Sequence, residues 1–99
     1  MTFTQVVEFR TSRIDELNSY FDAWIDRTDG QRVPHQARLF RVRDTGGTDY
    51  QLVVEFASHD AAVDNSGRPA TGEFAAFLSS ICERPPTFRS LDALRDDRL

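Results

Sequence analysis

The sequence predicts an α+β fold in which strands and helices follow the order strand, helix, strand, strand, helix, strand. Two observations carry this prediction. Apolar residues recur at helical spacing in two stretches that occupy equivalent places in the two halves of the chain, and apolar and polar residues alternate in the segments beside them. A chain of 99 residues has room for one modest core, so residues 1–99 are expected to form a single domain.

The first half opens with a strand expected at residues 3–10, which are rich in β-branched and aromatic side chains. A helix follows at about residues 13–28, where Ser12 is a candidate N-cap and Gly30 suits a left-handed stop. The apolar positions of this helix form one stripe: Ile14, Leu17, Phe21, Trp24 and Ile25.

A hairpin is expected in the middle of the chain. Its strands run over residues 36–43 and 50–57, and residues 44–49 turn the chain through Gly46 and Gly47, which tolerate positive φ. The second of these strands alternates strictly, and four of its side chains belong against the helices: Tyr50, Leu52, Val54 and Phe56.

The second helical region begins at Ser58 and is interrupted at residues 65–69, which contain both Gly and Pro. It resumes at Thr71 and ends before the proline pair that starts at Pro85. Its apolar stripe is expected to cover the same sheet face as the first helix: Phe74, Phe77, Leu78, Ile81 and Cys82.

The last segment carries two conflicting signals. Residues 90–95 have the local propensity of a capped helix. A fourth strand at about residues 88–94 would instead cover a sheet edge that the symmetric order otherwise leaves open. Because tertiary context overrides weak local propensity, we expect the strand.

The charge and the cysteine content restrict the partners and the compartment. The formal net charge of −4 gives no electrostatic reason to expect nucleic acid or a membrane surface. The single cysteine, Cys82, cannot form an internal disulfide, and its place on an apolar stripe favours burial over nucleophilic chemistry. Residues 1–10 lack the features of a signal peptide and no run is long enough to span a membrane, so we expect a cytoplasmic protein.

The sheet face turned away from the helices is expected to mix apolar residues with carboxylates and arginines. That composition suits packing of the sheet on the sheet of a second copy, and a solvated face is the alternative. We therefore expect a homodimer. Its expected interface residues are Val6, Glu8, Arg38, Phe40, Val42, Val53 and Glu55.

Several stretches resemble a known group of proteins. The element order, the turn at residues 44–49, the passage YQLVVEFASHDAA at 50–62 and PPTFRSLD at 85–92 resemble the dimeric α/β-barrel superfamily, which contains the antibiotic biosynthesis monooxygenase-like proteins. The resemblance implies a ferredoxin-like protomer, a dimeric barrel and a small-molecule pocket between the sheet and the helices. Some members oxidise polycyclic aromatic compounds without metal or flavin, so no cofactor is expected.

Six residues are candidates for binding a ligand in such a pocket, five of them on the helix surfaces and in the helix break. Tyr20 and Trp24 combine apolar area with a polar group, although the spacing of Trp24 also suits a plain core residue. Asn65, Ser66 and Arg68 lie in the break of the second helical region, where freed backbone groups and a guanidinium are able to hold a carbonyl or carboxylate.

His59 is the sixth candidate ligand residue, and His59 and Asn65 are also the candidates for catalysis. The imidazole of His59 follows the expected cap of the second helical region and could accept a proton near neutral pH, although a solvated first-turn histidine is the alternative. His35 lies far from His59 in the sequence, and two histidines without a third ligand do not predict a metal site.

Two hypotheses about function remain. The first is a small dimeric protein that binds an aromatic or polyketide-like molecule, and the second is a cofactor-independent monooxygenase or isomerase. The first is favoured because the sequence shows no convergent acid and base pair. An RNA-recognition module is excluded because the expected outward positions of the first and third strands carry valine and glutamate rather than stacking aromatics.

Overall fold

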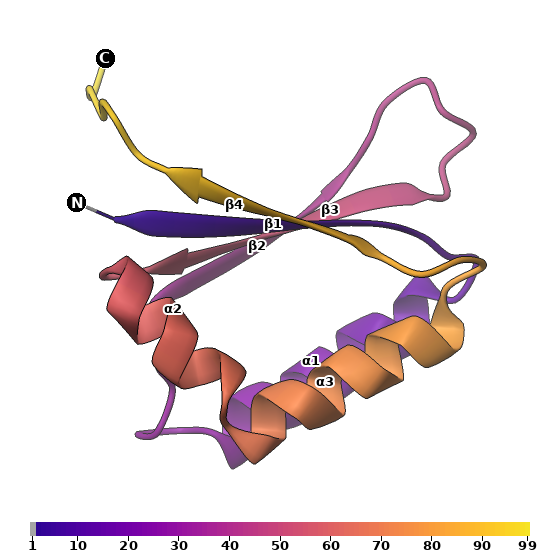
Figure 1. Ribbon diagram of the computed structural model, residues 1–99. Helices are drawn as coiled ribbons and strands as arrows, with labels where there is room; N and C mark the ends of the chain where they lie inside the picture. Colours follow the sequence, from indigo (N-terminus) through magenta and orange to yellow (C-terminus); the bar gives the residue numbers. More distant parts are fainter. Residues whose placement is uncertain (1) are drawn as a thin grey trace.

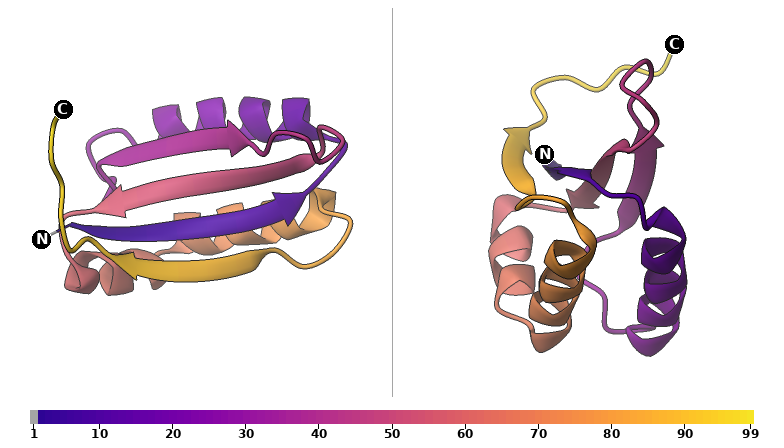
Figure 2. Two further views of the ribbon diagram at one scale, coloured as in Figure 1. Left: turned by 90° about the horizontal axis from the view of Figure 1, so that it is seen from above. Right: turned by 90° about the vertical axis from the view of Figure 1, so that its right-hand side faces the viewer.

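A four-stranded antiparallel sheet with every helix on one of its faces makes up the computed structural model, which describes residues 2–99 (Figure 1). The elements follow in the order β1 (Phe3–Arg10), α1 (Ile14–Arg27), β2 (Gln36–Arg41), β3 (Asp49–Phe56), α2 (His59–Ser66), α3 (Pro69–Ile81) and β4 (Thr87–Asp92). The strand order across the sheet is β2-β3-β1-β4. Figure 2 shows α1 and α3 side by side under the sheet, so the predicted α+β fold is confirmed.

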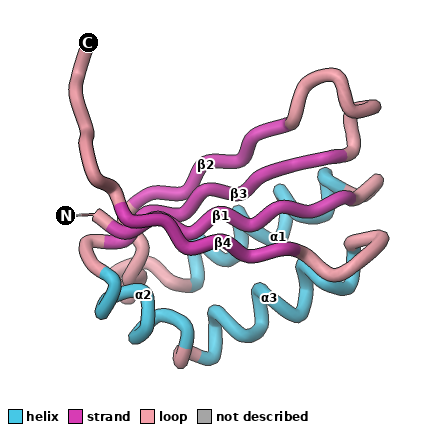
Figure 3. The backbone as a smooth tube through the Cα atoms, turned by 45° about the horizontal axis from the view of Figure 1, so that its top comes forward, coloured by secondary structure: helices cyan, strands magenta, loops and turns pink. Residues whose placement is uncertain are grey.

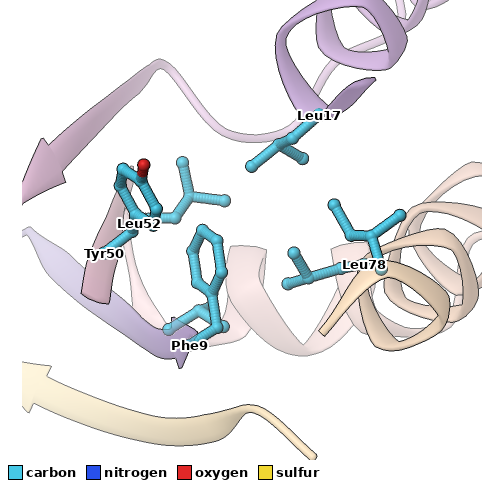
Figure 4. Close-up of a cluster of buried hydrophobic side chains, with 7 residues drawn as sticks. Phe9, Leu17, Tyr50, Leu52 and Leu78 are labelled. Atoms are coloured by element: carbon cyan, nitrogen blue, oxygen red, sulfur yellow. The ribbon is translucent and has the colours of Figure 1, made fainter. Parts of the chain in front are cut away.

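The central strand β1 sets the two faces of the sheet. It pairs with β3 along its whole length, with Val7 opposite Leu52. Alternate side chains of β1 therefore face the helices, among them Val7 and Phe9, which are both buried. Figure 4 shows the core built by these strands with α1 and α3: Phe9, Leu17, Tyr50, Leu52 and Leu78.

The start of α1 differs from the prediction. Its N-cap is Arg13, whose side chain makes no capping hydrogen bond, rather than Ser12. Thr11, which precedes the helix, caps it instead: its Oγ1 accepts a hydrogen bond of 3.0 Å from the backbone N–H of Arg13. The same hydroxyl donates to the carbonyl oxygen of Ile81 at the end of α3, at 2.6 Å. One fully buried side chain thus satisfies backbone groups at the ends of two helices.

Replacing Thr11 by Val is expected to lower the free energy of unfolding by about 2 kcal/mol, because both helix ends then lose their partner for a buried backbone group. Urea unfolding followed by circular dichroism measures the change. The control is Thr45→Val, which removes an exposed hydroxyl that donates to the carbonyl of Val42 in the hairpin loop. A loss at Thr11 no larger than the loss at Thr45 contradicts the double-cap assignment.

The second helical region is broken as predicted. Ser58 caps α2, since its Oγ accepts a hydrogen bond of 3.1 Å from a backbone N–H in the first turn. The C-cap of α2 is Gly67, and α3 begins at Pro69, earlier than the predicted Thr71. Figure 3 shows α2 and α3 as separate segments joined by a short loop. None of the helices in the described part of the chain is both long and apolar enough to cross a membrane.

The hairpin between β2 and β3 turns where predicted, although β2 ends at Arg41, two residues before the predicted end. Three residues beyond it adopt positive φ: Asp44 at 64°, Gly46 at 89° and Gly47 at 85°. This left-handed backbone curls the chain and ends the pairing, and the two glycines adopt it without the penalty of a Cβ. The predicted role of the glycines is therefore confirmed.

β4 is the segment whose local propensity favours a helix. Its residues pair with β1, with Phe88 opposite Val7 and Ser90 opposite Gln5. The predicted strand is confirmed, because pairing gives partners to backbone groups that the edge of β1 would otherwise leave open. Beyond β4 the chain leaves the sheet on the side opposite the helices (Figure 1).

Candidate functional site

A cavity of about 270 Å³ lies between the sheet and the helices. Its floor is the helix-facing side of β1 and β3, its walls are α1 and α3, and the loop before β2 and the end of α2 complete it. Apolar residues make up most of the lining, as is usual for sites that bind small organic molecules. The apolar lining residues from the sheet are Val7, Ala37, Leu52, Val54, Phe56 and Phe88.

Three aromatic rings form the helical wall of the cavity. Phe21 and Trp24 lie on one face of α1 because they are one turn apart, and their ring centroids are 5.4 Å apart. Phe74 of α3 meets both edge-on, with centroid distances of 5.8 Å to Phe21 and 6.2 Å to Trp24. The wall therefore offers flat apolar surface from two helices.

The indole N–H of Trp24 is a hydrogen-bond donor that lacks an acceptor in the described chain. Nε1 is buried, and it finds no hydrogen-bond partner anywhere in residues 2–99. A buried donor without a partner costs free energy, and buried Trp N–H groups usually find an acceptor. An acceptor on a bound molecule would remove this cost.

Polar side chains reach the cavity from several elements. Gln5 comes from β1, Asn65 from the end of α2 and Thr71 from the first turn of α3. His35 lies just before β2, where its backbone N–H donates to the carbonyl of Glu55 at 3.0 Å. Its Nε2 is 3.5 Å from Oε2 of Glu55, a geometry that places a carboxylate beside the imidazole.

The predicted ligand residues divide into two groups. Trp24 and Asn65 line the cavity, whereas Tyr20 lies outside its lining and stacks on Phe77 with centroids 4.1 Å apart. His59 is exposed and packs edge-on against Phe3 at 5.1 Å.

Ser66 and Arg68 also lie outside the lining of the cavity. The hydroxyl of Ser66 donates to the carbonyl of Val63 at 2.7 Å within α2. Arg68 donates to Asp64 and, at 3.0 Å, to the carbonyl of Gln31 in the loop before β2. Arg68 therefore ties the α2–α3 junction to the loop that carries the cavity residues Arg32 and His35.

Sequence reasoning did not assign Gln5, Arg32 or His35 to a pocket. Gln5 carried a signal, since it is the one polar residue among the helix-facing positions of β1, between Phe3 and Val7. Arg32 and His35 carried none, because they lie in a loop whose path depends on how α1 and β2 pack.

Several ionisable groups outside the cavity have shifted pKa values, among them Asp49 and Cys82. The guanidinium of Arg10 donates two hydrogen bonds, of 2.7 and 3.1 Å, to the carboxylate of Asp49, and this lowers the pKa of Asp49. Burial raises the pKa of the Cys82 thiol, which keeps it protonated at neutral pH, as expected for a packing residue. Within residues 2–99, His, Cys, Asp and Glu form no group of three suited to a metal ion.

The open face of the sheet presents the mixture of residues that the alternation predicts. Glu8 pairs with Arg89 at 3.2 Å, and Glu55 pairs with Arg38 at 3.8 Å. Phe40 remains 46% exposed between such pairs. The register places the predicted strand residues on this face, with Val42 directly beyond the end of β2: Val6, Glu8, Arg38, Phe40, Val53 and Glu55.

The fold recurs among solved structures at low sequence identity. SnoaB, a cofactor-independent oxygenase from Streptomyces nogalater, matches with a TM-score of 0.77 and 20% identity over 96% of this chain and 95% of its own. An antibiotic biosynthesis monooxygenase matches with a TM-score of 0.70 and 14% identity, over 96% of this chain and 100% of its own. A dimeric ferredoxin-like protein of unknown function from Jannaschia sp. CCS1 reaches 0.69 and 15%, over 94% and 100%.

These similarities confirm the predicted ferredoxin-like fold of the antibiotic biosynthesis monooxygenase-like proteins. No family model matches the chain, and no curated protein matches its sequence. At identities of 20% and below, the likeness establishes the architecture and leaves the chemistry to the residues of the cavity.

Proposed function

We propose that this protein binds a small, flat aromatic or polyketide-like molecule in the cavity between the sheet and the helices. The observation that carries the proposal is the pairing of an aromatic wall with the buried, unpartnered Nε1 of Trp24 in the described chain. A ligand carbonyl or phenol oxygen would accept from this nitrogen. The volume of about 270 Å³ lies just below the roughly 300–1,000 Å³ typical of drug-sized ligands, so a compact ring system suits it.

The test uses 2-naphthamide, a neutral two-ring compound with a carbonyl acceptor. Trp24 is the sole tryptophan, so its indole N–H gives one peak in a ¹H–¹⁵N spectrum. We expect that peak to move on titration, with a dissociation constant on the order of 0.1–1 mM for so small a ligand.

A variant that fills the cavity distinguishes ligand binding in the cavity from ligand binding at the surface. Ala75 lines the cavity from α3, whereas its neighbour Ala76 is exposed and outside the lining. Ala75→Phe should weaken binding at least about 10-fold by filling the site, and Ala76→Phe should leave it unchanged. A Trp24 peak that never moves, or equal effects of the two variants, contradicts the proposal.

Cofactor-independent oxygenation is the second candidate function, and the position of His35 favours it. His35 lines the cavity, and an imidazole in that position is suited to take a proton from bound substrate. Anthrone illustrates a balanced reaction. His35 removes a methylene proton, the carbanion reduces O₂ and forms a C–O bond, the imidazolium of His35 returns its proton to the peroxide anion, and loss of water from the hydroperoxide leaves anthraquinone. The similarity of fold to SnoaB agrees with this chemistry.

We propose further that two copies pair through the open face of their sheets. Exposed Phe40 and the partly buried Val53 supply apolar area, and the ion pairs of Glu8 and Glu55 flank it. The similar fold of a dimeric ferredoxin-like protein supports the pairing. The two cavities would remain on the outer sides, away from the shared interface.

The cytoplasm is the location that we propose. The supporting observation is the single, half-buried Cys82, which shows no use of disulfide bonds. The net charge of −4 favours neither nucleic acid nor an anionic membrane as a partner. A small molecule and a second copy of the chain are the proposed partners.

A further inference from the structure

The ionisable residues around the cavity are strongly biased in sign. The chain has 16 carboxylate residues and 12 arginines, yet no Asp or Glu lines the cavity. Arg32 and His35 are the two lining residues that can carry charge, and that charge is positive for both. Among the described residues, Arg32 is thus the one lining residue with a permanent charge, in a protein whose formal net charge is −4.

The guanidinium of Arg32 is anchored on one side. Its Nη1 donates to the carbonyl oxygen of Ile25 at 2.7 Å, in the last turn of α1. This bond satisfies a carbonyl at the helix end and fixes the arginine against the cavity wall that α1 provides.

Within residues 2–99, the charge of Arg32 has only a weak partner. Nη2 is 3.8 Å from a carboxylate oxygen of Asp29, which is too long for a hydrogen bond. The Asp29 side chain is 87% exposed, so water screens this pair, whereas the Arg32 side chain is 31% exposed. A carboxylate on a ligand would make shorter and better-aligned bonds to the same planar group.

We propose that Arg32 selects ligands whose aromatic ring system carries a carboxylate. This inference rests on the proposed function, since it specifies the charge of a molecule held in the same cavity. The ring system lies against Phe21, Trp24 and Phe74, and its carboxylate reaches the guanidinium at the loop before β2. His35, which precedes β2 in the same loop, also lines the cavity.

The experiment compares 2-naphthoate with 2-naphthamide, which share their rings and differ in charge. Trp24 indole shifts and calorimetry give both dissociation constants. We expect 2-naphthoate to bind about 10-fold or more tightly than 2-naphthamide, because a charge-assisted bond to arginine favours the anion. Raising NaCl should weaken 2-naphthoate binding only.

Arg32→Gln isolates the role of the guanidinium. It should raise the dissociation constant of 2-naphthoate about 10- to 100-fold and leave that of 2-naphthamide nearly unchanged. The matched control is Arg27→Gln, which removes an arginine of the same helix end that pairs with Glu73 at 3.7 Å and does not line the cavity.

The outcomes separate the two proposals. If 2-naphthamide binds at Trp24 but 2-naphthoate has no advantage, or if Arg32→Gln weakens both ligands equally, the selectivity of Arg32 is refuted and the cavity function stands. If neither compound moves the Trp24 indole peak, the cavity function fails and the selectivity fails with it.

Discussion

Replacing Phe40 and Val53 together by Asp is expected to convert a dimer into a monomer of 11.3 kDa. Both side chains lie on the open face of the sheet, Phe40 on β2 and Val53 on the neighbouring β3. Two carboxylates placed in an apolar contact would have to be desolvated without partners, so the dissociation constant should rise at least about 100-fold. Sedimentation equilibrium measures the mass, and circular dichroism checks that the monomer is folded.

The control for this prediction is Val63→Asp. Val63 is 56% exposed on α2, which lies on the helix side of the sheet. The substitution introduces a carboxylate at an exposed apolar position away from the proposed interface. It should leave the mass of the dimer, as measured by sedimentation equilibrium, unchanged. A double variant that keeps the mass of the native protein would show that the open face is not the contact between copies.

Replacing His35 by Gln is expected to slow the oxidation of anthrone about 10²- to 10⁴-fold, the range that a positioned proton acceptor contributes. Glutamine keeps a similar polar side chain at the cavity but cannot take the methylene proton. The rate is followed as anthraquinone formation with O₂ present, after subtraction of the reaction without protein. Binding of 2-naphthamide should persist, since the aromatic wall is untouched.

His59→Gln supplies the matched control, because His59 is the second of the two histidines and packs on Phe3 outside the cavity lining. It should leave the rate as it is. Equal losses for the two variants would indicate a general effect of histidine removal. A native protein that does not accelerate the reaction would leave ligand binding as the function that the cavity supports.

Local chemistry predicted the elements well. The stripe that contains Leu17 and Trp24 has no competing strand pattern, the two glycines of the hairpin require positive φ, and Ser58 caps α2 through a contact three residues away. Such features depend on neighbours within one turn, so the sequence alone carries them. The cap of α1 was assigned to Ser12, whereas Thr11 accepts from the N–H of Arg13; only the second bond of Thr11, to the carbonyl of Ile81, is remote in sequence.

The composition of the cavity was only partly predictable. Trp24 and Asn65 were singled out by residue type and place along the helices, and both line the cavity. Gln5, Arg32 and His35 join them only because β1, the loop before β2 and the helices converge. Residue type alone also pointed to His59, which packing leaves on the surface.

The sequence by itself determined the order of the elements and which face of each helix and strand is apolar, because periodicity and turn chemistry are local. The tertiary structure decided that β4 is a strand, since the pairing partners of that segment belong to β1 at the other end of the chain. It also decided that, among the described residues, the ionisable side chains lining the cavity are Arg32 and His35. Side chains from distant segments share one site only after the helices pack on the sheet. Local sequence patterns therefore do not predict which of these residues lie together.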